Sequence, residues 1–182
     1  MADDYRNSTI PGLTRGIRNN NPGNIAVKDN WQGMVGNDGT FLIFADMSWG
    51  IRAIGISLIN MIGKGYNTIA TLIPQWSATD QAAYVANVAA YTTLDPNTQL
   101  GTDADTIQSL IQAIVNQENG EFAQYVTADD MAAGMSLINS GSLVSAVQSV
   151  AVQASNDPTT AIPYLAIAIG GFFFLRWVMR KK

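Results

Sequence analysis

The sequence contains no cysteine and no histidine among its 182 residues. The absence of cysteine excludes disulfide bonds and thiol nucleophiles, and the absence of histidine excludes imidazole general bases and Ser-His-Asp triads. Together they remove the common zinc sites, so we expect no metal and no cofactor. Any acid–base chemistry must therefore come from aspartate and glutamate side chains.

Basic residues are scarce, and none occurs between Lys64 and Arg176. Four of the ten basic residues lie in the last seven positions, so residues 1–175 hold six basic against 14 acidic residues, a net charge of −8. Because no continuous basic face can neutralise a row of phosphates, we expect no nucleic acid as a partner. An acidic body also gains no electrostatic attraction to anionic cell-wall polymers.

Glutamate is scarce as well, and both copies, Glu118 and Glu121, lie in one seven-residue stretch, 116–122. They end a segment from about residue 103 in which apolar residues recur at the spacing of one buried helix face. At about 100° per residue, Glu118 falls on this face. A carboxyl group against an apolar wall tends to keep its proton, which is the state that a glycosidase general acid needs. The alternative is a frayed helix end whose last glutamate meets solvent.

The C-terminal part is an uncharged apolar run. Residues 159–175 carry no charge, and Trp177, Val178 and Met179 extend the run beyond Arg176. Seventeen helical residues span about 25 Å, and Arg176 can reach the interface, so 159–179 predicts a transmembrane helix. The basic tail 180–182 would prefer the cytoplasmic or anionic-lipid side. The alternative is a buried C-terminal core helix.

The rest of the chain has room for one domain of ordinary size. We expect a flexible leader over 1–14, with no signal peptide because Asp3 and Asp4 interrupt it. A globular domain over 15–140 and a helical stalk over 141–158 would follow.

Turn formers and helical periodicity divide this domain into elements. Residues 15–24 are too rich in turn formers for helix or central strand, and Pro22-Gly23 suits a type II turn. Extended pieces at 25–27 and 40–44, separated by a glycine-rich stretch, predict a small hairpin. Helices are expected over 49–62, 68–75, 80–90, 103–117, 128–139 and 142–154, with Asp103 and Thr127 as N-caps. The fold class is therefore mainly α, with a small β-hairpin (α+β).

The asparagines of residues 19–24 admit two interpretations. Their amides both donate and accept, which suits recognition of sugar hydroxyl and acetamido groups, yet asparagine also suits turns because it tolerates left-handed backbone. Aromatic residues near them and further along the chain could line a groove against sugar rings or pack in the core. The candidate substrate-binding residues are Asn20, Asn21, Asn24, Trp31, Phe44 and Tyr84.

Several short motifs follow one another along residues 15–125. The specific one is RGIRNNNPGNI at 15–25, and shorter ones follow it at Trp31-Gln32-Gly33, Phe41, Phe44, Gly50-Ile51-Arg52-Ala53, Thr68-Ile69, Trp76, Tyr84, Val88 and Glu118-Asn119-Gly120. In this order they resemble a bacteriophage virion-associated, lysozyme-like family of murein-degrading proteins, in which the later matches are individually weaker than the first.

The resemblance implies a mostly helical lysozyme-like fold that cleaves peptidoglycan between N-acetylmuramic acid and N-acetylglucosamine. Glu118 matches the catalytic acid at the helix end of lytic transglycosylases. In other muralidases with a similar asparagine turn the glutamate-bearing helix precedes the turn, whereas here it follows, so a circularly permuted arrangement is expected. Similar sequences also carry a longer segment beginning Trp-Ala-Pro where this chain has 76–80, which predicts a shortened cleft wall.

The leading hypothesis is a membrane-anchored phage enzyme with Glu118 as its single catalytic acid–base. A hydrolase would need a second carboxylate, for which Asp29, Asp38 and Asp46 are candidates, so a lytic transglycosylase fits better. Its partners would be the peptidoglycan glycan strand, a lipid bilayer of the virion or the host inner membrane, and other virion proteins. The alternative is a non-enzymatic virion membrane protein that keeps the lysozyme-like body.

Overall fold

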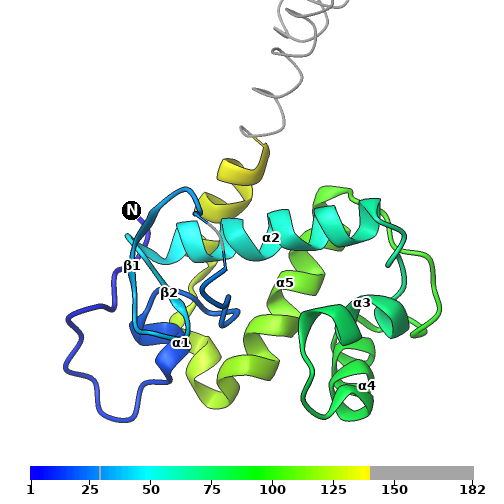
Figure 1. The fold of residues 1–182 in the computed structure, drawn as a ribbon, viewed down its shortest axis with the longest axis horizontal. Helices are drawn as coiled ribbons and strands as arrows, with labels where there is room; N and C mark the ends of the chain where they lie inside the picture. Colours follow the sequence, from blue (N-terminus) through cyan, green and yellow to red (C-terminus); the bar gives the residue numbers. More distant parts are fainter. Residues whose placement is uncertain (29, 140–182) are drawn as a thin grey trace, which may run out of the picture. The chain divides into compact units, whose positions relative to one another are not determined.

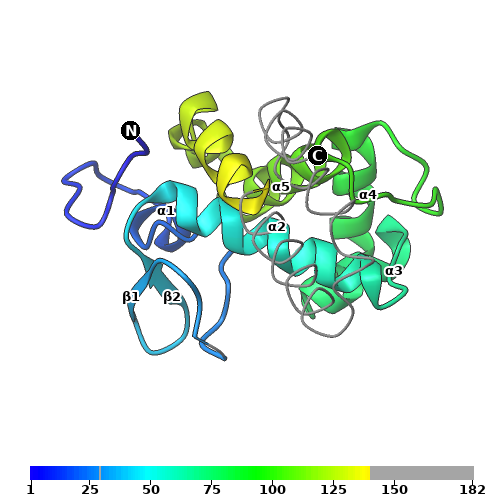
Figure 2. The ribbon, with the colours of Figure 1, turned by 90° about the horizontal axis from the view of Figure 1, so that it is seen from above.

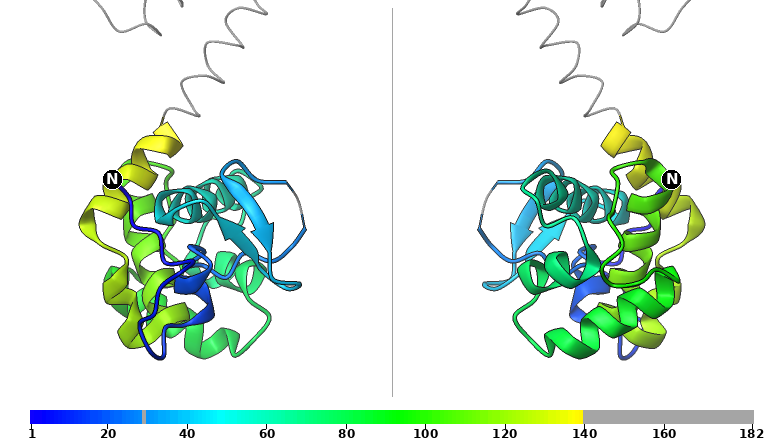
Figure 3. Two further views of the ribbon diagram at one scale, coloured as in Figure 1. Left: turned by 90° about the vertical axis from the view of Figure 1, so that its left-hand side faces the viewer. Right: turned by 90° about the vertical axis from the view of Figure 1, so that its right-hand side faces the viewer.

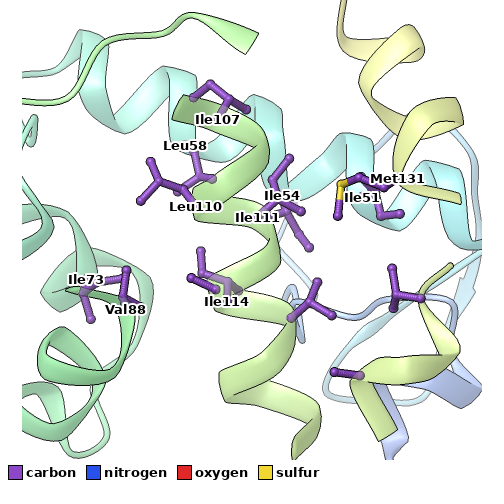
Figure 4. Packing of buried hydrophobic residues seen from close by; sticks show 14 of the residues in the cluster. Ile51, Ile54, Leu58, Ile73, Val88, Ile107, Leu110, Ile111, Ile114 and Met131 are labelled. Atoms are coloured by element: carbon purple, nitrogen blue, oxygen red, sulfur yellow. The ribbon is translucent and has the colours of Figure 1, made fainter. Parts of the chain in front are cut away.

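Two helices with apolar residues at helical spacing form the centre of the molecule. They are α2 (Met47–Gly63) and α5 (Ala104–Asn119), and α2 lies across α5 with the apolar faces in contact (Figures 1 and 4). The contact is made by buried side chains, Ile51, Ile54 and Leu58 from α2 and Ile107, Leu110, Ile111 and Ile114 from α5. Burial of such side chains contributes about 1.5–3 kcal/mol each, so this helix pair determines where the last turn of α5 lies.

The structure is a computed structural model that describes residues 1–28 and 30–139. Met1–Ile138 form one unit, mainly helical with one two-stranded antiparallel hairpin, as predicted from the sequence. The stalk over 141–158, the transmembrane helix over 159–179 and the basic tail over 180–182 lie outside the described residues. Within 1–28 and 30–139, no helix is long and apolar enough to cross a membrane.

Two shorter helices lie at one end of α2, opposite the hairpin (Figures 1 and 2). The first, α3 (Ile69–Trp76), begins at a capping box in which the side chains of Thr68 and Thr71 each accept a backbone N–H. The second, α4 (Gln81–Thr92), packs against both α3 and α5. Tyr84 and Val88 are buried on its inner face, so α4 delivers Tyr84 toward the end of α5.

The hairpin differs from the sequence prediction in its first strand. It pairs β1 (Met34–Asn37) with β2 (Leu42–Phe44), so its first strand lies inside the glycine-rich stretch rather than at 25–27. Ala26 forms only an isolated bridge with Phe41. The glycines are not loop residues throughout: Gly39, with φ 91°, makes the turn between the strands, whereas Gly36 pairs with Ile43.

The segment 15–24 also departs from its prediction, because it begins with one helical turn, α1 (Arg15–Arg18). Thr14 caps this turn by accepting the N–H of Ile17. The chain then leaves the helix through Asn20 and Asn24, both with φ 50°. Gly23 does not have positive φ, so Pro22-Gly23 is not the predicted type II turn, although the N–H of Asn24 does bond the carbonyl of Asn21 at 3.0 Å.

The last described helix covers 128–139 and lies on the opposite side of α2 from the hairpin (Figures 2 and 3). Its predicted N-cap is confirmed, since the Thr127 hydroxyl accepts the N–H of Asp130 at 3.2 Å. The buried carboxylate of Asp130 also accepts the N–H of Asp3 at 2.7 Å. The first residues of the chain therefore contact its last described helix.

Candidate functional site

Glu118 lies in the last turn of α5, where the helix meets the asparagine-rich turn. The helix begins as predicted at Asp103, whose side chain accepts the N–H of Thr106 at 2.9 Å. After Asn119 the chain continues as a 3-10 helix, η1 (Gly120–Tyr125), which the sequence analysis missed. Glu118 is half-buried, so its carboxylate is neither enclosed in the core nor free in solvent.

Two side chains from distant segments hold the Glu118 carboxylate, one on each oxygen. The hydroxyl of Tyr84 on α4 donates to Oε1 at 2.9 Å. The side-chain amide of Asn24 donates to Oε2 through Nδ2 at 2.8 Å. In the described part of the chain no lysine or arginine forms an ion pair with Glu118. The carboxylate is thus oriented by neutral donors, which leaves its charge unneutralised.

The phenol of Tyr84 is a stable donor in this arrangement. Burial raises the pKa of Tyr84, and the negative charge of Glu118 and the hydrogen bond to it raise the pKa further, while Trp76 opposes the shift. The side chain is 4% exposed. The raised pKa keeps the Tyr84 hydroxyl protonated near neutral pH, and the buried side chain orients Glu118 rather than offering a surface to a sugar.

Asn119, which the sequence analysis named only within the Glu118-Asn119-Gly120 match, joins α5 to the asparagine-rich turn. Its Nδ2 donates to the carbonyl oxygens of Pro22 at 2.7 Å and Val115 at 2.9 Å. Its Oδ1 accepts the hydroxyl of Thr14 at 2.7 Å. Because Asn119, the residue after Glu118, forms hydrogen bonds through both Nδ2 and Oδ1, it holds the last turn of helix α5 against the asparagine-rich turn. The sequence feature that could have predicted this role is the amide side chain directly after an inward-pointing glutamate.

Two of the asparagines proposed to bind sugar have a structural role instead. Asn20 and Asn21 are both 0% exposed. Asn21 donates to the carbonyl oxygens of Ile25 and Leu42, both at 3.0 Å, and accepts the N–H of Ile25 at 2.9 Å. Asn20 similarly bonds the backbone of Phe44 at 3.2 Å and of Tyr5 at 2.9 Å. Their amides are used to join segments, so the prediction that they bind substrate is wrong.

The prediction that Phe44 contacts substrate is also wrong, because its side chain is 0% exposed in a small cluster with Leu42 and Ala53. Trp31 is half-buried and lines a pocket of about 250 Å³. The pocket walls are formed by Gly23, Asn24, Ile25, Ala26, Lys28, Trp31, Ser57, Met61, Gln75 and Trp76.

This pocket adjoins the Glu118 carboxylate through shared residues. Asn24 lines the pocket and donates a hydrogen bond to Glu118, while Trp76 lines the pocket and opposes the rise in the pKa of Tyr84. Its volume is slightly below the roughly 300–1,000 Å³ of complete ligand sites. It therefore suits one ring of a chain-like ligand, with two indoles available as ring contacts.

The candidate second carboxylates are engaged elsewhere or lie outside the described residues. Asp38 accepts from Arg15 at 2.5 and 2.6 Å and from Asn19 at 2.6 Å, and the Arg15 guanidinium holds the pKa of Asp38 well below its usual range. Asp46 caps α2 by accepting the N–H of Ser48 at 3.0 Å. Asp29 is not among the described residues.

Glu121 is exposed on η1, away from these contacts. Among residues 1–28 and 30–139 no cluster of acidic side chains is arranged to hold a metal ion.

Comparison of the sequence with models of known protein families gives no match, and comparison with curated proteins gives none.

Proposed function

We propose that this protein cleaves the glycan strand of peptidoglycan between N-acetylmuramic acid and N-acetylglucosamine, as a lysozyme-like, circularly permuted enzyme of phage origin. The observation that carries the proposal is the pair of neutral donors on Glu118 beside an indole-lined pocket. A half-buried carboxylate without a cation is suited to exchange a proton with a substrate, whereas an ion-paired or sealed glutamate is not.

Glu118 would act first as an acid and then as a base. Its proton passes to the glycosidic oxygen as the bond from that oxygen to the anomeric carbon breaks. The resulting carboxylate then takes the proton of the substrate's own 6-hydroxyl as that oxygen attacks the anomeric carbon. The product is a 1,6-anhydro sugar, and Glu118 ends the cycle protonated again.

The engagement of Asp38 and Asp46 favours this route over hydrolysis. An inverting hydrolase needs a second carboxylate about 6.5–9.5 Å from the acid to activate water, and a retaining one needs a nucleophile about 5–5.5 Å away. Each of the two aspartates already accepts hydrogen bonds that hold the fold. Attack by the substrate's own hydroxyl requires neither.

Glu118→Gln tests the proposal, because the amide keeps the shape of the side chain but cannot donate the catalytic proton. We expect digestion of purified peptidoglycan to fall by at least about 10²-fold. The products should be 1,6-anhydro muropeptides, identified by mass spectrometry. Glu121→Gln, which removes the same charge from an exposed position, should retain wild-type activity.

The alternative, a virion protein without enzymatic activity, is favoured by the burial of Asn20, Asn21 and Phe44. Tyr84 is buried as well, so four of the six side chains predicted to contact sugar have almost no exposed surface. If the folded wild-type protein releases no muropeptides, this alternative replaces the enzyme. Reducing-end products would instead indicate a hydrolase.

A further inference from the structure

Asn24 has one satisfied and one unsatisfied end. Its Nδ2 donates to Glu118 Oε2 at 2.8 Å. Its Oδ1 is buried and has no hydrogen-bond partner, which holds for no other buried side-chain nitrogen or oxygen atom in the described part of the chain. A buried acceptor without a donor costs free energy. The hydrogen bond from Nδ2 to Glu118 must therefore be what maintains this orientation of the amide.

The surroundings of Oδ1 are rich in oxygen atoms. Gly16 lies beside it, and a Cβ atom built on Gly16 would be 3.0 Å from Asn24 Oδ1, 3.0 Å from the carbonyl oxygen of Asn21 and 2.8 Å from Asn119 Oδ1. The amide nitrogen of Asn119, whose Oδ1 lies beside Gly16, already donates to two backbone carbonyls. The space therefore suits a donor better than the acceptor that occupies it.

Turning the Asn24 side-chain amide over, that is, flipping it about the bond to Cβ, would exchange the positions of Oδ1 and Nδ2 with almost no change of shape. The NH₂ group would then face the oxygens beside Gly16, and the carbonyl oxygen would face Glu118 Oε2. Two oxygen atoms at hydrogen-bond distance repel unless one of them carries a proton. The turned amide is thus compatible only with a protonated Glu118.

We propose that the Asn24 amide turns over when Glu118 gains or loses its proton, so that each protonation state of the acid–base has a matched partner. The carboxylate accepts from Nδ2, and the carboxylic acid donates from Oε2 to Oδ1. This inference rests on the acid–base role of Glu118 proposed above. Asn24 is then a positioning residue that holds the proton on Oε2 of Glu118.

Other ionisable groups near α5 do not provide this coupling. Tyr84 contacts Oε1 and remains a donor in both states. On the neighbouring elements, ionisable side chains have partners of their own or face solvent: Arg15 with Asp38, Arg18 with the carbonyl of Leu13, Arg52 over Trp49, Tyr125 stacked on Phe122, and exposed Glu121. Asn24 is therefore the side chain whose orientation should report the Glu118 proton.

Nuclear magnetic resonance of the full-length chain can test the coupling without an activity assay. Labelling glutamate at the side-chain carboxyl carbon gives two signals, because the sequence holds only Glu118 and Glu121. Asn24 Nδ2 is assigned by its loss in Asn24→Asp, a residue that also tolerates the φ of 50°. In a pH titration we expect Asn24 Nδ2 to shift with the same midpoint as the Glu118 carboxyl carbon.

Glu118→Gln should abolish the response of Asn24, and Glu121→Gln should leave it intact. An Asn24 signal that stays constant while the Glu118 carbon titrates, or one that still titrates in Glu118→Gln, would overturn the inference. A coupled amide in a protein that releases no muropeptides would leave the inference standing and would reject only the enzymatic role.

Discussion

At the scale of single residues, the character of Glu118 depends on side chains that are remote in sequence. The apolar periodicity of its helix was enough to predict that Glu118 points inward. The same periodicity could not identify its partners, since Tyr84 and Asn24 lie 34 and 94 residues away. Asn20 and Asn21 were misjudged for a related reason: their bonds to the backbone of Phe44 and Leu42 exist only once the hairpin has formed.

Tyr84→Phe removes the donor to Oε1 and keeps the buried ring. We expect kcat/KM on peptidoglycan to fall about tenfold, equivalent to about 1.4 kcal/mol of transition-state stabilisation, because the carboxylate loses one of its two orienting bonds. The free energy of unfolding should change by no more than about 1 kcal/mol, because water can reach the half-buried carboxylate.

Tyr91→Phe is the matched control, since Tyr91 lies on the same helix but is 49% exposed. Activity and unfolding free energy should both match wild type. Equal activity of the Tyr84→Phe variant and wild type would show that Oε1 needs no donor.

At the scale of elements, the longer helices were predictable, whereas the short elements on either side of the asparagine-rich turn and after α5 were not. All the helices expected before residue 140 are present, within two residues at each described end, because each buries a periodic apolar face. α1 and η1 are too short for periodicity to reveal. The first strand of the hairpin was hidden by its glycines, one of which makes a turn while another pairs with the partner strand.

The contact between α2 and the asparagine-rich turn depends on a missing side chain at Gly50. A Cβ atom there would run into the carbonyl oxygen of Asn20 and would lie 2.8 Å from Cδ of Pro22. The overlap with these backbone and ring atoms should cost more than the roughly 1 kcal/mol that alanine gains over glycine in a helix. Gly50→Ala should therefore lower the free energy of unfolding by about 1–3 kcal/mol. Activity should fall with it, because the turn carries Asn24.

Gly63→Ala on the same helix provides the opposite expectation. No atom lies within 4 Å of a Cβ atom built at Gly63, so alanine should be neutral or stabilising by up to about 1 kcal/mol. Urea unfolding of both variants measures the difference. A Gly50→Ala protein as stable as Gly63→Ala would mean that α2 and the turn can separate without cost.

At the scale of the whole molecule, an acidic body is followed by an uncharged apolar segment near the C-terminus. The net charge of −8 over residues 1–175 gives no attraction to anionic wall polymers, so we propose that the 159–179 segment supplies the proximity by anchoring the chain in a membrane. A charge in the centre of a span costs about 2.5–3.5 kcal/mol of insertion free energy.

Ile169→Asp in the full-length chain should therefore release the protein from membranes washed at alkaline pH, whereas wild type and Ala166→Leu should stay in the membrane pellet. Immunoblotting of the two fractions measures the distribution. Recovery of the wild-type chain in the supernatant would reject the anchor and leave the body as a freely diffusing protein.

The separation of 94 residues between Asn24 and Glu118 also sets when the site can exist during synthesis. A ribosome adds roughly 5–20 residues per second, so the asparagine-rich turn emerges several seconds before its partner helix has been made. The contact of Asp3 with Asp130 is later still. A nascent chain or a truncated product that ends before α5 is complete therefore carries no assembled carboxylate site.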